Sequence, residues 1–245
     1  MKHYLLSIFL LISSFCFAQD RPASSNESYR KACKRHSAAQ IKGLHNGVLL
    51  VRLQTKQSTI DALRERGKAR QAVQVEADQK RYNQALVVAF QHSFDFCPVY
   101  FFYSHYTQVV KEGKLDSVEF LDENLLPTRD IPSEKSYFLV AEVTSVVGDT
   151  AKHFDHYYVE PTANGPERKA AYYGGNNFGF RALVMKSDQF IQLTRPFPYY
   201  ERLLQKSMPT IVSGMNQNLH RFYDKTIQKQ KRKAKRKANR NRANA

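Results

Sequence analysis

The chain has 245 residues, with 38 Lys and Arg against 22 Asp and Glu, which gives a formal net charge of +16. This length allows one domain with a real core, and 42% hydrophobic residues exclude a chain that is disordered throughout. Ten basic residues and no acidic ones lie in residues 225–245, so most of the positive excess belongs to a C-terminal tail and not to the folded body.

Residues 1–18 have the parts of a secretory signal: a positive start at Lys2, an apolar run of about fourteen residues, and a small-x-small cleavage pattern ending at Ala18. We expect cleavage before Gln19 and export to the periplasm or the medium. The run is shorter than the roughly 18 to 20 residues that cross a bilayer, and we expect no transmembrane segment after cleavage. The alternatives are an uncleaved anchor or a lipid-modified Cys16, which the bulky neighbouring side chain of residue 15 disfavours.

The next segments predict the start of an α/β fold. Residues 19–45 read as a polar leader followed by a short helix, and the apolar run of residues 46–55 predicts a buried strand. A capping pattern at Ser58 then starts a helical stretch that reaches about Phe94. That helix would be roughly 50 Å long if straight, so we expect a break at its weak point, Gly67.

A second apolar strand at residues 98–104 completes a right-handed βαβ unit with parallel strands. We then expect a short strand at 117–121, a strong strand at 136–146 and an alternating strand at 153–160. Two strands at 180–186 and 190–195 are expected to form a hairpin. A last helix is expected to begin near 198–201 and to be interrupted near Pro209. The predicted fold class is therefore a single α/β domain over residues 46–224, with a mixed sheet that ends in a β-hairpin. Its C-terminal helix is expected to run into a disordered basic tail, residues 225–245.

The order of a βαβ unit, a β-hairpin and a helix resembles the thioredoxin-like family. The paired-cysteine motif of that family is missing, because Cys97 is followed by Pro98, Val99 and Tyr100 with no second cysteine. The resemblance therefore implies a similar topology without the redox chemistry.

Two cysteines, Cys33 and Cys97, remain after cleavage of the signal. In an oxidising compartment they would pair as a disulfide between the N-terminal segment and the second strand. The alternative is two unpaired thiols that behave as small hydrophobic side chains.

The densest set of titratable groups is His153, Asp155, His156 and Glu160, which have the side chains for zinc or acid-base chemistry. On a strand, however, His156 would point away from His153 and Asp155, so the spacing favours a half-exposed edge strand. His105, at the carboxyl end of the second strand, is a further catalytic candidate without an acid or nucleophile near it in sequence. We expect no metal site and no cofactor.

Two other patterns have structural interpretations that we favour. The glycine-rich segment 174–179 fits a hairpin turn better than a phosphate loop, because a strand and not a helix follows it. The tyrosine pairs at 157–158, 172–173 and 199–200 would suit glycan binding if exposed, but in strands each pair would place one ring in the core and one at the surface.

The tail carries the strongest functional signal, since its residues 229–245 have no side chain large and apolar enough to join a core. Its expected anionic-surface-binding residues are Lys229, Lys231, Arg232, Lys233, Lys235, Arg236, Lys237, Arg240 and Arg242. The sequence thus predicts an exported, non-catalytic binding or structural component of the cell envelope, held at an anionic membrane surface or another polyanion, with a protein partner as a further option. The alternatives are an envelope enzyme, metal-dependent or not, with a His/Asp site, and a nucleic-acid-associated protein.

Overall fold

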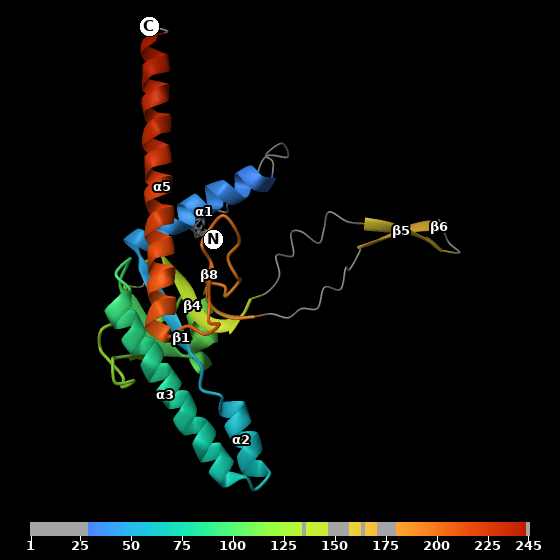
Figure 1. Cartoon of the computed structure of the whole chain (residues 1–245), viewed down its shortest axis with the longest axis vertical. Coiled ribbons are helices and arrows are strands. Elements are labelled where there is room, and N and C mark those ends of the chain that lie inside the picture. Colours follow the sequence, from blue (N-terminus) through green and yellow to red (C-terminus); the bar gives the residue numbers. More distant parts are fainter. Residues whose placement is uncertain (1–28, 134–135, 147–156, 163–164, 171–179, 244–245) are drawn as a thin grey trace, which may run out of the picture.

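A computed structural model describes residues 29–133, 136–146, 157–162, 165–170 and 180–243 (Figure 1). The predicted signal peptide, His153, Asp155, His156 and the glycine-rich segment 174–179 lie outside these residues.

The described chain forms a six-stranded mixed sheet in the order β3-β2-β1-β4-β7-β8, and a separate antiparallel ribbon of β5 and β6. The strands are β1 (Val48–Leu53), β2 (Val99–Tyr103), β3 (Phe120–Leu121), β4 (Phe138–Ser145), β5 (Tyr157–Thr162), β6 (Gly165–Ala170), β7 (Arg181–Lys186) and β8 (Tyr200–Arg202). The helices are α1 (Tyr29–Asn46), α2 (Gln57–Glu65), α3 (Ala69–Ser93), α4 (Thr107–Lys111) and α5 (Met208–Ala243), with 3-10 turns η1 (Ser104–Tyr106) and η2 (Leu115–Ser117). The fold class predicted from the sequence is confirmed.

The βαβ unit has the expected form, with β1 parallel to its neighbour β2. The expected break in the connecting helix falls at Gly67, whose φ of 70° is accessible to glycine at little cost. Two helices, α2 and α3, result. They lie side by side and extend from the sheet at the end opposite to the tail (Figure 1).

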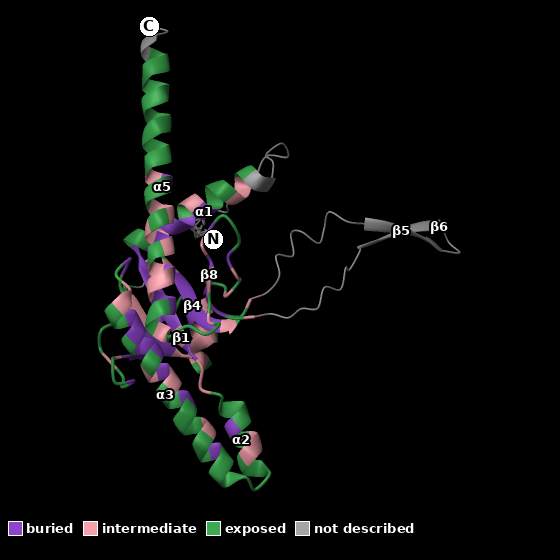
Figure 2. Ribbon diagram, in the orientation of Figure 1, coloured by how far each residue is buried: buried purple, intermediate pink, exposed green. Residues whose placement is uncertain are grey.

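The sheet has one face under the long helices and the other under short segments. On the first face, side chains of α1, α3 and α5, such as Leu44, Phe90 and Val212, pack against alternate residues of the central strands. Figure 2 shows that the strands β1 and β4 are largely buried. On the second face α4 and η2 cover Leu50 and Phe102 through residues such as Val110. The sheet is therefore the middle layer of the domain.

The region after β7 differs from the prediction. Residues 190–195 form no strand, only an isolated bridge between Lys186 and Gln192. On the side away from β4, the strand that pairs with β7 is β8. The last helix begins at Met208 and not near residues 198–201. Pro209 lies in the first turn of this helix, where a residue needs no amide donor. The Ser207 hydroxyl caps the same turn by accepting a hydrogen bond from the backbone N–H of Thr210. This proline therefore starts the helix instead of interrupting it.

The tail also differs from the prediction, since α5 continues as one helix to Ala243 where disorder was expected from residue 225. The reason is composition: Lys, Arg, Gln and Ala are among the strongest helix formers, and the segment contains neither Gly nor Pro. Within the described residues, none of the helices combines the length and the hydrophobicity needed to cross a bilayer.

Candidate functional site

The tail is built on a helix that the body holds firmly. The first half of α5 buries Ile211, Met215 and Leu219 against the sheet and α3. Further along, the ring of Tyr223 stacks on His45 of α1, with centroids 4.0 Å apart and planes 3° from parallel. Thr226 is the last buried residue of α5. The body therefore fixes the direction in which the rest of the helix leaves.

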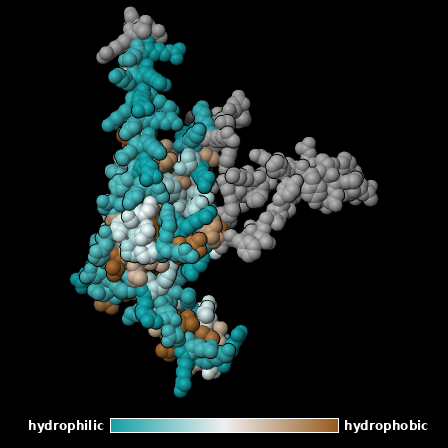
Figure 3. Space-filling view, viewed as in Figure 1, coloured by the Kyte–Doolittle hydropathy of each residue, from teal (hydrophilic) through white to brown (hydrophobic). Residues whose placement is uncertain are grey.

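Beyond this anchor α5 stands free in solvent. Residues 228–241 are all exposed, and the helix projects past the sheet as a rod (Figures 1 and 2). At 1.5 Å per residue, residues 228–243 extend roughly 24 Å. The visible surface of this rod is hydrophilic along its length (Figure 3). Because its side chains pack on nothing in the described chain, they are available to another surface.

The positive charges of the rod fall in rows. Lys229, Lys233 and Lys237 are spaced four residues apart and share one face, and a parallel row of Arg232, Arg236 and Arg240 lies beside it. A third row, Lys231, Lys235 and Arg242, lies on the other side. No carboxylate pairs with the cations of residues 229–240, whose side chains the structure describes. The rod therefore has one crowded cationic face and a weaker one behind it.

Of the catalytic candidates, His105 lies within the described residues, whereas His153, Asp155 and His156 lie outside them. His105 is exposed in η1, after β2, and its ring lies 4.2 Å from the ring centroid of Tyr106 and 6.0 Å from that of Tyr103. Its described neighbours are thus aromatic. No group of three His, Cys, Asp or Glu side chains placed to hold a metal occurs in the part of the chain that the structure describes.

Cys33 and Cys97 are free thiols, so of the two sequence-based alternatives the structure has the unpaired one. Cys33 is half-buried on α1, whereas Cys97 is buried just before β2. Burial raises the pKa of Cys97 to about 12, and a hydrogen bond from the Leu49 backbone opposes this only in part. Cys97 is therefore protonated at neutral pH and suited to packing.

Among the tyrosine pairs, the side chains of the pair at 199–200 are described. Tyr199 is buried and Tyr200 is half-buried.

Sequence reasoning missed a buried ion cluster in the centre of the sheet. Glu142 of β4 is only 2% exposed and binds Arg52 of β1 and Lys186 of β7. Burial alone would raise the pKa of Glu142, but the hydrogen bonds and charges of Lys186 and Arg52 together hold it below its ordinary value. Arg52 also donates to the hydroxyl of Thr107 and lies over the ring of Phe190. One signal was present in the sequence: Arg52 and Glu142 are each the single charged residue of an otherwise largely apolar strand, β1 and β4.

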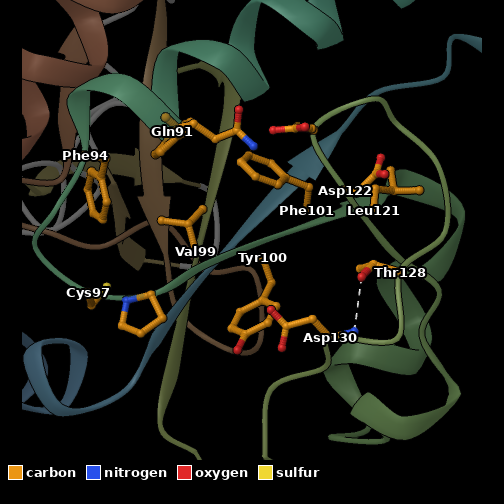
Figure 4. Close-up of a pocket in the computed structure, with 13 residues that line it drawn as sticks. Gln91, Phe94, Cys97, Val99, Tyr100, Phe101, Leu121, Asp122, Thr128 and Asp130 are labelled. Carbon is orange, nitrogen blue, oxygen red and sulfur yellow. Dashed lines mark hydrogen bonds between the residues drawn. The ribbon is translucent and has the colours of Figure 1, made fainter.

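A second missed feature is an open pocket of about 500 Å³ at the β2–β3 edge of the sheet (Figure 4). Aromatic side chains, Phe94, Tyr100 and Phe101, share its lining with carboxylates that include Asp122 and Asp130. The Asp130 charge helps to raise the pKa of Tyr100, after desolvation, which is the larger cause. Carboxylates next to aromatic faces suit cations. This pocket was not predictable from the sequence, because its lining combines residues from four separate segments.

Comparison with known proteins adds no relative: no family model, no curated protein and no solved structure matches this chain.

Proposed function

We propose that this protein is an exported, non-catalytic binding component of the cell envelope, held at anionic surfaces by the cationic end of α5. The observation that supports the proposal is the free rod of residues 228–243, which carries cations in rows, projects from the body and packs on nothing described.

Electrostatic attraction alone is enough to hold such a rod at a membrane. A Lys or Arg near an anionic leaflet contributes about 1 kcal/mol, so engagement of even half of the cations gives useful binding. The rod has no apolar face, since its non-basic residues beyond Gln228 are Gln, Asn and Ala. It is therefore suited to adhere to headgroups and not to insert among acyl chains.

The body then acts as the part that is held in place. Because Tyr223 and Thr226 tie the base of the rod to the body, adhesion of the rod would set the orientation of the sheet as well as its distance from the surface. A flexible polybasic tail would give no such orientation.

The test is co-sedimentation of residues 19–245 with phosphatidylglycerol-containing vesicles, with phosphatidylcholine vesicles and with duplex DNA, across a salt series. We expect binding to the anionic vesicles that falls steeply with salt and is lost in a chain ending at residue 227. Equal binding by the full and the shortened chain would contradict the proposal. Binding to DNA without binding to anionic vesicles would favour the nucleic-acid alternative instead.

Two variants of equal net charge sharpen the test. One replaces Lys229, Lys233 and Lys237 by Gln on the crowded face, and the other replaces Lys231, Lys235 and Arg242 by Gln on the opposite face. A rod lying on a flat surface meets it with the crowded face, so the first variant should lose more binding than the second. Equal losses would show that total charge, and not the geometry of the rod, determines binding.

A further inference from the structure

A cavity of about 390 Å³ lies between α3 and the carboxyl ends of β1 and β4. Leu53 and Gln54 line it where β1 ends, and Val143 lines it from β4. The strand that follows β1 in the chain, β2, pairs with one edge of β1, whereas the later strand β4 pairs with its other edge. All three strands are parallel. The cavity therefore stands where the strand order reverses, which is the place where open α/β sheets bind their ligands. Its volume suits a small molecule.

The helix side of the cavity presents buried amides in a fixed arrangement. Gln79 and Asn83, one turn apart on α3, are 7% and 4% exposed. The Gln79 Nε2 donates to Asn83 Oδ1 at 2.9 Å, and the Asn83 Nδ2 donates to the carbonyl of Gln54 at 2.9 Å. This ladder uses one N–H of each side-chain amide, so each amide retains a second donor. Buried donors held rigidly in a cavity wall are what a polar ligand requires.

Tyr82, which also lines the cavity, supplies an unsatisfied group. Its hydroxyl is buried and has no hydrogen-bond partner within the described residues. Desolvation raises the pKa of Tyr82, and the nearby charge of Arg181 acts in the opposite direction. A buried hydroxyl without a partner is costly, so a ligand that accepts a hydrogen bond from it would remove that cost.

The charges around the cavity favour an anion. Its lining contains one acid, Asp78, and three basic residues, Arg52, Lys56 and Arg181, of which Arg52 is already paired with Glu142. The carboxylate of Asp78 is already engaged, since it accepts from Gln74 at 2.9 Å and from Arg81. Lys56 has a φ of 54°, a left-handed conformation that costs energy in a non-glycine residue and that concentrates at functional sites. Leu53, Leu86 and Val143 give the lining an apolar part.

We propose that this cavity is a binding site for a small organic carboxylate with an apolar body. The anionic head would meet Arg181 and accept from the Tyr82 hydroxyl, while the body would lie on Leu53, Leu86 and Val143. Inorganic phosphate fits less well, because it offers nothing to the apolar lining. This site is independent of the tail, so the two proposals can fail separately.

The test uses residues 19–245 and calorimetric titration with benzoate and hexanoate as carboxylate probes. Benzamide serves as the neutral counterpart of benzoate, and inorganic phosphate serves as an anion that has no apolar part. We expect both carboxylates to bind, and benzamide and phosphate to bind about tenfold more weakly or not at all. R181Q should weaken benzoate binding by a similar factor, whereas R129Q, an exposed arginine outside the cavity lining, should leave it unchanged.

A variant of Tyr82 separates a binding role from a structural one. Y82F removes the unpaired hydroxyl, so we expect the free protein to melt at the same or a higher temperature while its affinity for benzoate falls. The proposal is overturned if neither carboxylate binds in the millimolar range, if benzamide binds as well as benzoate, or if R181Q and Y82F leave the affinity unchanged.

Discussion

Glu142 and Arg52 face each other in the parallel register of β4 and β1, and their side chains form an ion pair with an N–O distance of 2.5 Å. Lys186 approaches the same carboxylate from β7, on the other side of β4. The carboxylate thus links three adjacent strands on the face covered by α4. A shift of register by one residue would turn Glu142 to the opposite face, among the long helices. We therefore infer that the cluster helps to fix the register of the central strands.

The first prediction concerns the removal of that charge. E142Q leaves Arg52 and Lys186 largely buried without an anion, so we expect it to lower the free energy of unfolding by about 3 kcal/mol. Denaturant titration measures this loss. The matched control is E112Q, at an exposed glutamate, where a change within about 0.5 kcal/mol is expected. An equal effect of the two substitutions would contradict a stabilising role for the cluster.

The second prediction concerns acid. The pKa of Glu142 in the folded protein lies below its ordinary value of 4.5, so between these two values the unfolded chain binds more protons. The stability that Glu142 contributes is fully present above pH 4.5 and is lost as the pH falls through the folded-state pKa. Denaturation curves measured from pH 6 downward should therefore converge for the wild type and E142Q in this window. A difference between them that does not change with pH would rule out this linkage.

The third prediction concerns the passage from α1 to β1. A Cβ placed on Gly47 would lie 2.0 Å from the carbonyl oxygen of Tyr137, and this oxygen also accepts the backbone N–H of Val48 at 3.0 Å. The oxygen cannot retreat without weakening the pairing of β1 with β4. We expect G47A to lose at least about 3 kcal/mol of unfolding free energy, because neither backbone segment can relax.

The control for Gly47 is Gly67, in the break between α2 and α3. An added Cβ meets nothing there, but the φ of 70° strains any other residue. G67A should therefore cost only about 1 kcal/mol. Thermal melts of both variants rank the two effects, and the reverse order would contradict the packing seen around Gly47.

These two glycines illustrate what the sequence could and could not predict. The break at Gly67 was predictable because it depends on local conformation and on the length of one helix. The requirement at Gly47 was not, since it arises from Tyr137, far along the chain. The buried strands and the parallel βαβ unit were likewise readable from short apolar runs. The start of α5 was predicted wrongly because the residues around Pro209 fit two interpretations equally well: a break within a helix, or a proline in the first turn of a helix. Only the packing of the folded chain decides between them.

The functional features divide in the same way. The cationic tail is a property of composition and was visible at once. Its repulsion between like charges predicted disorder, whereas the helix propensity of the same residues decides its state. The cavity beside Tyr82 and the edge pocket beside Tyr100 each combine residues from several segments. No spacing rule in a single sequence brings such residues together.

The fourth prediction concerns the tail helix. Its cations recur at intervals of four residues, and like charges at this spacing destabilise an isolated helix. Raising the salt concentration screens this repulsion, so the helical circular dichroism of the full chain, minus that of a chain ending at residue 227, should increase with salt. Anionic vesicles should produce the same increase at low salt. A variant with Lys229, Lys233 and Lys237 replaced by Gln should respond less to salt, and an equal response would show that repulsion does not limit the helix.

The fifth prediction concerns the two thiols. With a pKa of about 12, on the order of 10⁻⁴ of the Cys97 thiol is ionised at pH 8, and its burial also blocks reagent. In the protein of residues 19–245, which lacks Cys16, an aromatic disulfide reagent should therefore label the native state once, at the half-buried Cys33, and the unfolded, unreduced state twice. C33S should leave the native protein unlabelled, which assigns the native reaction to Cys33. If unfolded, unreduced wild-type protein showed no reactive thiol, the two cysteines would be paired. The packing of Cys97 as a small hydrophobic side chain would then be wrong.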